Sequence, residues 1–203
     1  MNSKQARRAY VSPTRAQAAA DTRARAMKAA SEILRANGDI GFSLEAVAAA
    51  AGVTRQTLYR SFGSQRGLLE AVLDDLSDRG GIGRLDTLAD PKDPHAALDE
   101  LVTIYCEFWD SDTALFHLYN ALFTDPRVVE ALKDRIAPGP RIIRSIVDNA
   151  RPDAPPAQRK DMAELIFGLM QPPLFRGLMQ DRSAADIAAL LRPLVHDVVS
   201  KRA

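Results

Sequence analysis

The sequence predicts an all-α protein of about nine helices. Apolar residues recur at steps of three and four residues over most of the chain, which is the period of an amphipathic helix. Glycine, proline and capping residues divide these stretches into segments of helix length, and no alternating stretch of strand length occurs. The 203 residues are enough for one large domain or for two small ones that share a core.

The N-terminal stretch, residues 1–20, is polar and basic, and we expect a flexible arm that leads into the first helix. The helical pattern begins at Asp21. Its apolar stripe consists of Met27, Ala30, Ile33 and Leu34. Asn37-Gly38 is expected to end this helix, because glycine accepts the left-handed conformation that follows a helix.

Three shorter helices are predicted to follow, each after a residue that can cap it. Ser43 precedes the second helix, Thr54 precedes the third, and Ser64 precedes the fourth, which covers residues 65–79. Gly52 makes the turn between the second and third helices a tight one. The resulting order is long helix, short helix, tight turn, short helix and capped helix.

The rest of the chain is also predicted to be helical, after a loop from Gly80 to Pro94. Prolines break it again at Pro138-Gly139-Pro140, at 151–156 and at Pro172-Pro173. The expected helices cover about 95–109, 112–123, 125–149 with the break or kink at Pro138, 157 onward to the break at Pro172, and 184–201.

Charge is distributed unevenly along the chain. Residues 1–70 hold 11 Lys and Arg against 5 Asp and Glu, a net charge of +6, and the remainder carries −5. This asymmetry favours a polyanionic partner for the front of the chain, although a solvated basic tail without a partner is the competing interpretation.

Several classes are disfavoured. One cysteine, Cys106, excludes an intrachain disulfide, and no apolar run approaches the roughly 18 residues that span a membrane. The N-terminus has no apolar segment typical of a secretory signal. We therefore expect a cytoplasmic protein with no membrane partner. The sequence also shows no metal-ligand cluster, phosphate-binding loop or nucleophile motif, so we expect neither a cofactor nor an enzyme.

The function is indicated by residues 48–62. Small residues, Ala48, Ala51 and Gly52, stand where the two helices of a helix-turn-helix must cross. Leu58 and Phe62 form the apolar back of the third helix. The exposed set consists of Arg55, Gln56, Thr57, Tyr59, Arg60 and Ser61. Arg pairs with guanine and Gln with adenine in the major groove, which makes this helix a candidate reader of DNA.

Residues 27–73 resemble the DNA-binding domain of the TetR (tetracycline-repressor-like) family of regulators. The matching elements are Ala29-Ala30 before Ile33-Leu34, Phe42-Ser43-Leu44 before Val47-Ala48, Ala51-Gly52-Val53-Thr54, Thr57-Leu58-Tyr59, Phe62-Gly63-Ser64 and Leu68-Leu69. The resemblance implies a helix-turn-helix domain at 21–66 and a ligand-binding and dimerisation domain at 67–203, connected by the helix at about 65–79.

The resemblance also implies the DNA contacts. Ser43, Thr54 and Tyr59 are expected to meet phosphate, although Tyr59 could instead serve packing. Arg55, Gln56, Thr57 and Arg60 are the candidates for base contacts. Gln65 departs from the family pattern, which often has Lys there. Arg66 or the N-terminal arm could compensate; the arm either reaches DNA through Lys4, Arg7, Arg8 and Arg15 or remains solvated.

The second domain of the family binds a small inducer and forms the homodimer. The residues that could line a pocket are Tyr105, Phe108, Trp109, Phe116, His117, Tyr119, Met170, Phe175 and Arg176, with Cys106 as a further polar candidate. Ordinary core packing is the competing role for each of them. The dimer is expected to use the last two helices, the first of them kinked. Its apolar residues would be Leu165, Leu169, Leu178, Ile187, Leu190, Leu191, Leu194 and Val198, with packing within the chain as the competing role for some of them.

The sequence thus predicts a transcriptional regulator: a homodimer that binds a roughly palindromic double-stranded operator and is released by an unknown small molecule. The alternative is a helix-turn-helix protein that binds DNA without any ligand, which a fully packed C-terminal half would favour. An enzyme using a Cys106–His117 pair lacks a third member.

Overall fold

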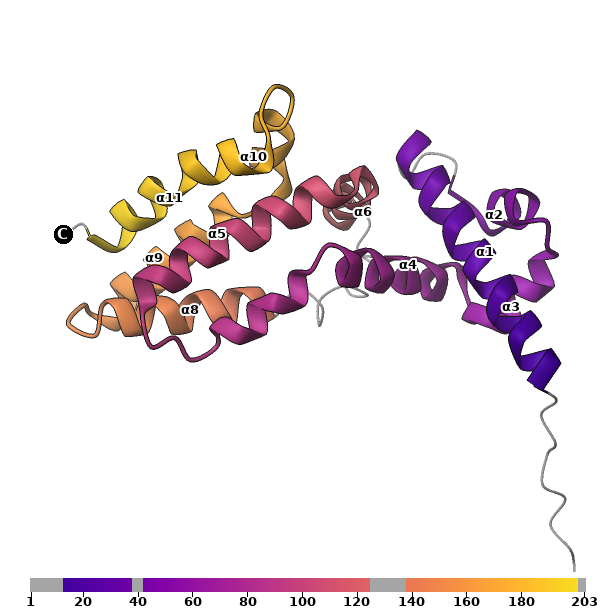
Figure 1. Ribbon diagram of the computed structural model, residues 1–203, viewed down its shortest axis with the longest axis horizontal. Helices are drawn as coiled ribbons and strands as arrows, with labels where there is room; N and C mark the ends of the chain where they lie inside the picture. The colour runs from indigo at the N-terminus through magenta and orange to yellow at the C-terminus, as the bar shows by residue number, and fades with distance from the viewer. Residues whose placement is uncertain (1–12, 38–41, 125–137, 201–203) are drawn as a thin grey trace, which may run out of the picture.

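The computed structural model describes residues 13–37, 42–124 and 138–200, and within these ranges the chain is all-helical (Figure 1). The predicted fold class is therefore confirmed. Ten α-helices and one 3-10 helix occur in the described ranges, rather than the nine helices expected. The expected start of a helix at Asp125, and the basic residues Lys4, Arg7 and Arg8 of the arm, lie outside the described residues.

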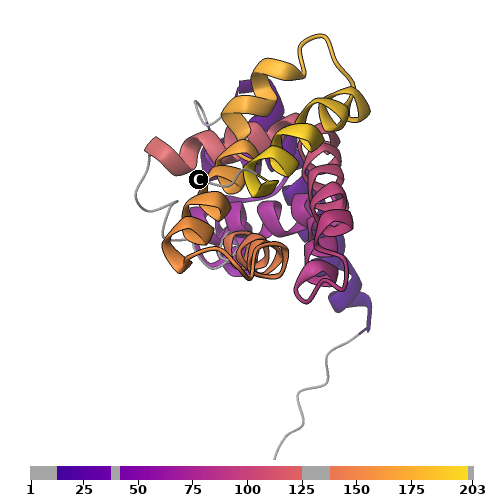
Figure 2. The same ribbon diagram turned by 90° about the vertical axis from the view of Figure 1, so that its left-hand side faces the viewer.

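The N-terminal helices form one end of an elongated molecule, and the remaining helices form the other (Figures 1 and 2). Helix α1 (Pro13–Asn37) lies across α2 (Leu44–Ala51) and α3 (Arg55–Phe62). Helix α4 (Gln65–Arg79) contacts α1 and α3 and also leads to the second group of helices. It is thus the connecting element.

Helix α1 begins eight residues earlier than expected. Residues 13–20 belong to the helix rather than to a flexible arm, and Pro13 suits the first helical position because it lacks an N–H that would have no partner there. The buried stripe is also displaced: Ala26, Ala29, Ala30 and Leu34 are buried, while Met27 and Ile33 are half-buried. Alanines therefore allow the close approach of α2.

The second group of helices contains five longer elements and two short ones. They are η1 (Ile82–Leu88, 3-10), α5 (Pro94–Ser111), α6 (Thr113–Thr124), α8 (Pro138–Ala150), α9 (Pro156–Leu169), α10 (Pro172–Leu178) and α11 (Ala184–Ser200). Helix α11 packs on α5, and α8 packs on α9. Their facing residues build a core that is continuous with that of the N-terminal helices.

One expectation about this region is wrong. The segment from Gly80 to Pro94, expected as a loop, contains η1, whose Leu85 and Leu88 are buried against the helices. Glycine is compatible with a helix start, so composition alone does not separate a start from a loop. Pro138-Gly139-Pro140 supplies the first turn of α8, and the residues before it, where the interrupted helix was expected, lie outside the described residues. Pro172-Pro173 does separate α9 from α10, as expected.

Candidate nucleic-acid interface and ligand cavity

The predicted caps of the helix-turn-helix are confirmed. The Ser43 hydroxyl accepts a hydrogen bond from the Ala46 amide at 3.1 Å, and the Thr54 hydroxyl accepts one from the Thr57 amide at 3.1 Å. Between them Gly52 adopts a left-handed conformation with φ 65°, which L side chains rarely adopt. The local sequence therefore fixes the start of α2, the turn and the start of α3.

Helix α3 presents a polar face to solvent and an apolar face to the core. Leu58 is buried, whereas the side chains of Arg55, Gln56 and Arg60 are exposed and Tyr59 is 42% exposed. Much of the Tyr59 side chain therefore faces solvent rather than the core. The arrangement leaves a row of hydrogen-bond donors and acceptors along an eight-residue helix, which is the form in which a helix reads a major groove.

Arg55 is held on this face by two neighbours. Its Nη1 lies 2.6 Å from a Glu45 carboxylate oxygen, and its Nη2 donates to the Tyr59 hydroxyl at 3.1 Å. The hydrogen bond to Tyr59 and the nearby Glu45 charge raise the pKa of Arg55 above its ordinary value. Sequence reasoning missed Glu45, because the pair joins two helices and depends on how α2 packs on α3.

Three further residues proposed to contact DNA have partners within the chain. The Thr54 and Thr57 hydroxyls are 2.9 Å apart, so one donates to the other. Gln65 donates from Nε2 to the Phe42 carbonyl at 3.2 Å, which ties the start of α4 to the start of α2. This hydrogen bond gives Gln65 a structural role, because its uncharged amide satisfies the Phe42 carbonyl.

Arginines of α1 that sequence reasoning did not single out position the helix-turn-helix. Arg23 donates to the Ser61 carbonyl at 2.8 Å, and its guanidinium lies 4.3 Å from the centre of the Phe62 ring. Arg25 donates to the Ala51 carbonyl at 3.1 Å. These bonds satisfy carbonyls at the C-terminal ends of α2 and α3, where the helices leave them without partners.

A cavity of about 130 Å³ lies in the second group of helices. Of the predicted pocket residues, it is lined by Tyr105, Phe108, Trp109 and Tyr119. The other residues around it are Ile82, Gly83, Leu85, Asp86, Pro138, Gly139, Phe167 and Gln171. Those from η1 were not foreseen, because that segment was expected to be a loop. Burial raises the pKa of the Tyr119 hydroxyl to about 12 and raises that of Tyr105 further, so both phenols are neutral.

The remaining pocket candidates do not line this cavity. Phe116 stacks on Trp109 with ring centres 5.4 Å apart, Phe175 is fully buried beside the same indole, and the Met170 carbonyl accepts a hydrogen bond from the Trp109 indole N–H at 3.0 Å. These three residues contact Trp109, which lines the cavity, but do not line the cavity themselves. His117 is half-buried and Arg176 is exposed, and neither is among the residues that line the cavity.

Cys106 lies in a different place from the aromatic cavity. It is buried and lines a hollow between α5 and α11, and burial raises the pKa of its thiol to about 12. The described residues contain no group of three or more His, Cys, Asp or Glu that could hold a metal ion.

The predicted dimer residues differ in exposure. Ile187 and Leu191 are buried within the chain, where α11 packs on α5, so they have the competing role of intrachain packing. Leu165, Leu190 and Leu194 are 60%, 48% and 48% exposed. Leu165 and Leu194 border a groove between α9 and α11 together with Leu169 and Val198.

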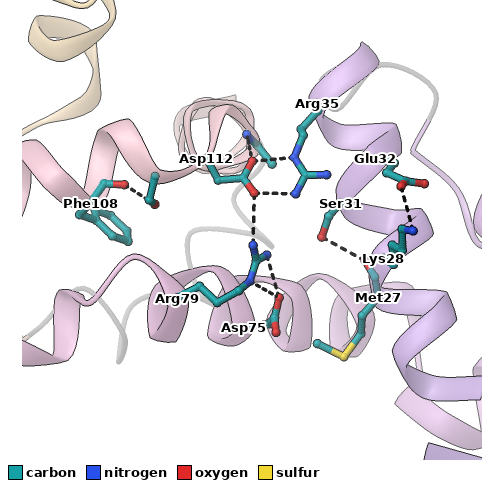
Figure 3. Close-up of polar contacts among 11 residues, drawn as sticks. Met27, Lys28, Ser31, Glu32, Arg35, Asp75, Arg79, Phe108 and Asp112 are labelled. Atoms are coloured by element: carbon teal, nitrogen blue, oxygen red, sulfur yellow. Dashed lines mark hydrogen bonds and ion pairs between the residues drawn. The ribbon is translucent and has the colours of Figure 1, made fainter. Parts of the chain in front are cut away.

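The two groups of helices meet at Asp112, which lies between α5 and α6 (Figure 3). Arg35, near the end of α1, donates from Nε and Nη2 to the two carboxylate oxygens at 2.8 and 2.6 Å. Arg79, at the end of α4, lies 3.8 Å away, and the Ala114 amide donates to the same carboxylate at 3.0 Å. A single carboxylate thus binds three elements together.

Comparison with known proteins shows what the helix-turn-helix segment is similar to. Residues 26–72 match the model for bacterial regulatory proteins of the tetR family. The comparison with curated proteins found no match. In the part of the chain that the structure describes, no helix is both long enough and apolar enough to cross a membrane.

Solved structures show the same fold over nearly the whole chain. FadR, a transcriptional regulator from Bacillus subtilis solved in complex with stearoyl-CoA, is 17% identical with a TM-score of 0.68, covering 89% of this chain and 99% of that one. NalD, the secondary repressor of the MexAB-OprM multidrug efflux pump in Pseudomonas aeruginosa, is 20% identical with a TM-score of 0.62, covering 88% and 96%.

A transcriptional regulator of the TetR/AcrR family from Thermobifida fusca is 19% identical with a TM-score of 0.62, covering 90% of this chain and 100% of that one. At these identities the likeness concerns the fold, while the family model concerns the sequence of the helix-turn-helix. Residues 26–72 therefore match the N-terminal domain of bacterial regulatory proteins of the tetR family, and the chain as a whole shares the fold of these solved structures.

Proposed function

We propose that the protein is a DNA-binding transcriptional regulator, a homodimeric repressor that a small molecule releases from its operator. The observation that carries the proposal is the exposed polar face of α3, in the segment that matches the family model. We divide the chain into a DNA-binding domain at 21–66 and a ligand-binding and dimerisation domain at 67–203. Action on bacterial DNA would place the protein in the cytoplasm.

The roles of the individual residues follow from their positions. Gln56 and Arg60 contact base edges, with Thr57 beside them. Arg55 does so once it leaves its ion pair with Glu45 and binds a base instead. Ser43 at the start of α2, Thr54 at the start of α3 and Tyr59 on α3 carry hydroxyls that suit phosphate oxygens. Gln65 contacts the Phe42 carbonyl, so we assign it only a supporting role at the interface.

The dimer is proposed to form through the groove between α9 and α11. A two-fold pairing would bury the exposed Leu165 and Leu194 against their copies, and two α3 helices would then meet successive major grooves, roughly 34–36 Å apart. Such a dimer would bind a roughly palindromic operator.

Release by a ligand is favoured over ligand-independent binding by the cavity. Its wall contains Trp109, and Asp112 lies on the next turn, bonded to Arg35 of α1. A ligand that displaces this end of α5 would therefore move α1 and with it α3. NalD and FadR show that proteins of this fold include a repressor and a ligand complex.

The test is a gel-shift assay with the DNA that flanks the protein's own gene. Arg60→Ala and Tyr59→Phe are expected to weaken binding, by about tenfold for the arginine and less for the tyrosine. Lys160→Ala, on the exposed face of α9, is the charge-matched control. Circular dichroism establishes that each variant is folded. Unchanged affinity in both α3 variants would contradict the assignment of this face to DNA.

A further inference from the structure

Aromatic residues are concentrated around the cavity. Five of the chain's twelve Phe, Trp and Tyr residues line it: Tyr105, Phe108, Trp109, Tyr119 and Phe167. Three of these rings also pack on one another, with the centres of Trp109 and Tyr119 4.8 Å apart and nearly perpendicular. The faces of aromatic rings carry partial negative charge, which attracts cations.

The polar groups that line the cavity also favour a cation. Among the described residues that line it, Asp86 is the one charged side chain, and none is Lys, Arg or His. Asp86 is exposed and makes no side-chain hydrogen bond or ion pair with another described residue, so its charge is available at the edge of the cavity. The Tyr105 and Tyr119 phenols and the Gln171 amide contribute uncharged dipoles.

From this combination we propose that the cavity binds a small organic cation, of the quaternary ammonium or protonated amine class, with its charged head against the aromatic rings and Asp86. The proposal rests on the proposed function, because it names the class of the releasing ligand. An anion would meet a carboxylate and ring faces and would find no opposite charge among the described lining residues.

The size of the cavity restricts the ligand. A volume of about 130 Å³ is slightly smaller than the roughly 150 Å³ cavity that is known in another protein to hold benzene. A trimethylammonium head therefore fits the cavity that the described residues line. Gly139 contributes to this volume, because a Cβ there would stand 2.6 Å from the Tyr105 hydroxyl.

The experiment compares three probes of similar shape: choline, the neutral 3,3-dimethylbutan-1-ol and the anion 3,3-dimethylbutyrate. Trp109 is the only tryptophan of the chain, so its fluorescence reports binding at the cavity directly, and calorimetry gives an independent affinity. We expect choline to bind at least about tenfold more tightly than the neutral probe, and the anion to bind weakest.

Two variants and a control localise the effect. Asp86→Asn is expected to weaken choline binding about three- to fivefold without changing the affinity of the neutral probe. Gly139→Ala is expected to weaken both probes, because the added methyl group takes up cavity space. Asp90→Asn is the matched control, since Asp90 is also exposed just after η1 but does not line the cavity.

Three results would overturn the proposal: equal affinity for choline and its neutral analogue, tighter binding of the anion, or no choline binding below about 10 mM. Operator binding is measured separately without any probe. Loss of choline selectivity with intact operator binding refutes the cation class alone, whereas failure to bind operator refutes the proposed function and leaves the cavity result standing.

Discussion

Trp109 and Asp112 lie one helical turn apart at the end of α5, and they face different parts of the molecule. Trp109 lines the cavity, while the Asp112 carboxylate is bonded to Arg35 of α1. One turn of helix therefore connects the candidate ligand site with the helix that supports α2 and α3. Any displacement of this turn changes both at once.

Loss of the Asp112 carboxylate should destabilise the protein. Its side chain is 6% exposed, but Arg35 is 37% exposed, so solvent screens part of the ion pair. We expect Asp112→Asn to lower the free energy of unfolding by about 1–3 kcal/mol in urea denaturation. Glu32→Gln, which removes an exposed carboxylate from α1, should change it by less than about 0.5 kcal/mol.

A double-mutant cycle separates the pair from its surroundings. Arg35→Met and Asp112→Asn together should cost less than the sum of the two single changes, because each removes the same interaction. Strict additivity would show that Asp112 acts through Arg79 or the Ala114 amide rather than through Arg35.

Acid should destabilise the protein through the same carboxylate. Burial alone would raise the pKa of Asp112, but the hydrogen bonds from Arg35 and the Ala114 amide outweigh it and lower the pKa below the ordinary value. A lowered folded-state pKa stabilises the protein above the unfolded pKa of about 4 and loses that contribution as pH falls below it.

The measurement is the free energy of unfolding between about pH 6 and pH 3. Asp112→Asn should show a shallower decline than the native protein on the acid side of about pH 4, because one proton-linked group is gone. Equal slopes for the two proteins would contradict a lowered pKa at Asp112.

Removing the charge of Glu45 should strengthen DNA binding. Glu45 holds Arg55 at 2.6 Å and places a carboxylate beside the surface proposed to meet phosphates. Glu45→Gln should therefore tighten operator binding by about two- to fivefold at low salt, measured by fluorescence anisotropy over a series of salt concentrations. Glu107→Gln, on the exposed side of α5, should leave the affinity unchanged. Weaker binding by Glu45→Gln would instead show that Glu45 positions Arg55 for DNA.

Charge placed in the groove between α9 and α11 should separate the subunits. Leu165→Glu would put a carboxylate at the proposed two-fold interface, where pairing brings it near its own copy and removes it from water. Sedimentation should then show monomers at concentrations where the native protein is dimeric. Ala185→Glu, on the opposite side of α11 beside Cys106, should remain dimeric. A Leu165→Glu variant that stays dimeric would place the interface elsewhere.

The helix-turn-helix was predictable from the sequence because short-range interactions determine it. Ser43, Thr54 and Ser64 cap helices that begin at the next residue, and Gly52 takes the positive φ that its turn requires. Each of these features depends on residues at most four positions apart, and the apolar period then determines which face of α3 is buried.

Contacts between residues that are far apart in the sequence could not be predicted from local patterns. Sequence spacing could not show that Arg35 reaches Asp112, 77 residues away, or that Arg55 pairs with Glu45 on another helix. It also could not distinguish Ile187, which is buried within the chain, from Leu194, which faces solvent, because both belong to the apolar pattern of one helix. Periodicity reports that a face is apolar, and only the packing of the other helices decides what covers it.

The sequence by itself therefore determined the all-α class, the caps and turn of the helix-turn-helix, and the polar face of α3. The tertiary structure alone decided which aromatics line the cavity and which only support its wall, and it brought η1 with Asp86 to its edge. The physical reason is that caps and turns are local hydrogen-bond choices, whereas a cavity is space left between helices whose relative positions depend on the whole core.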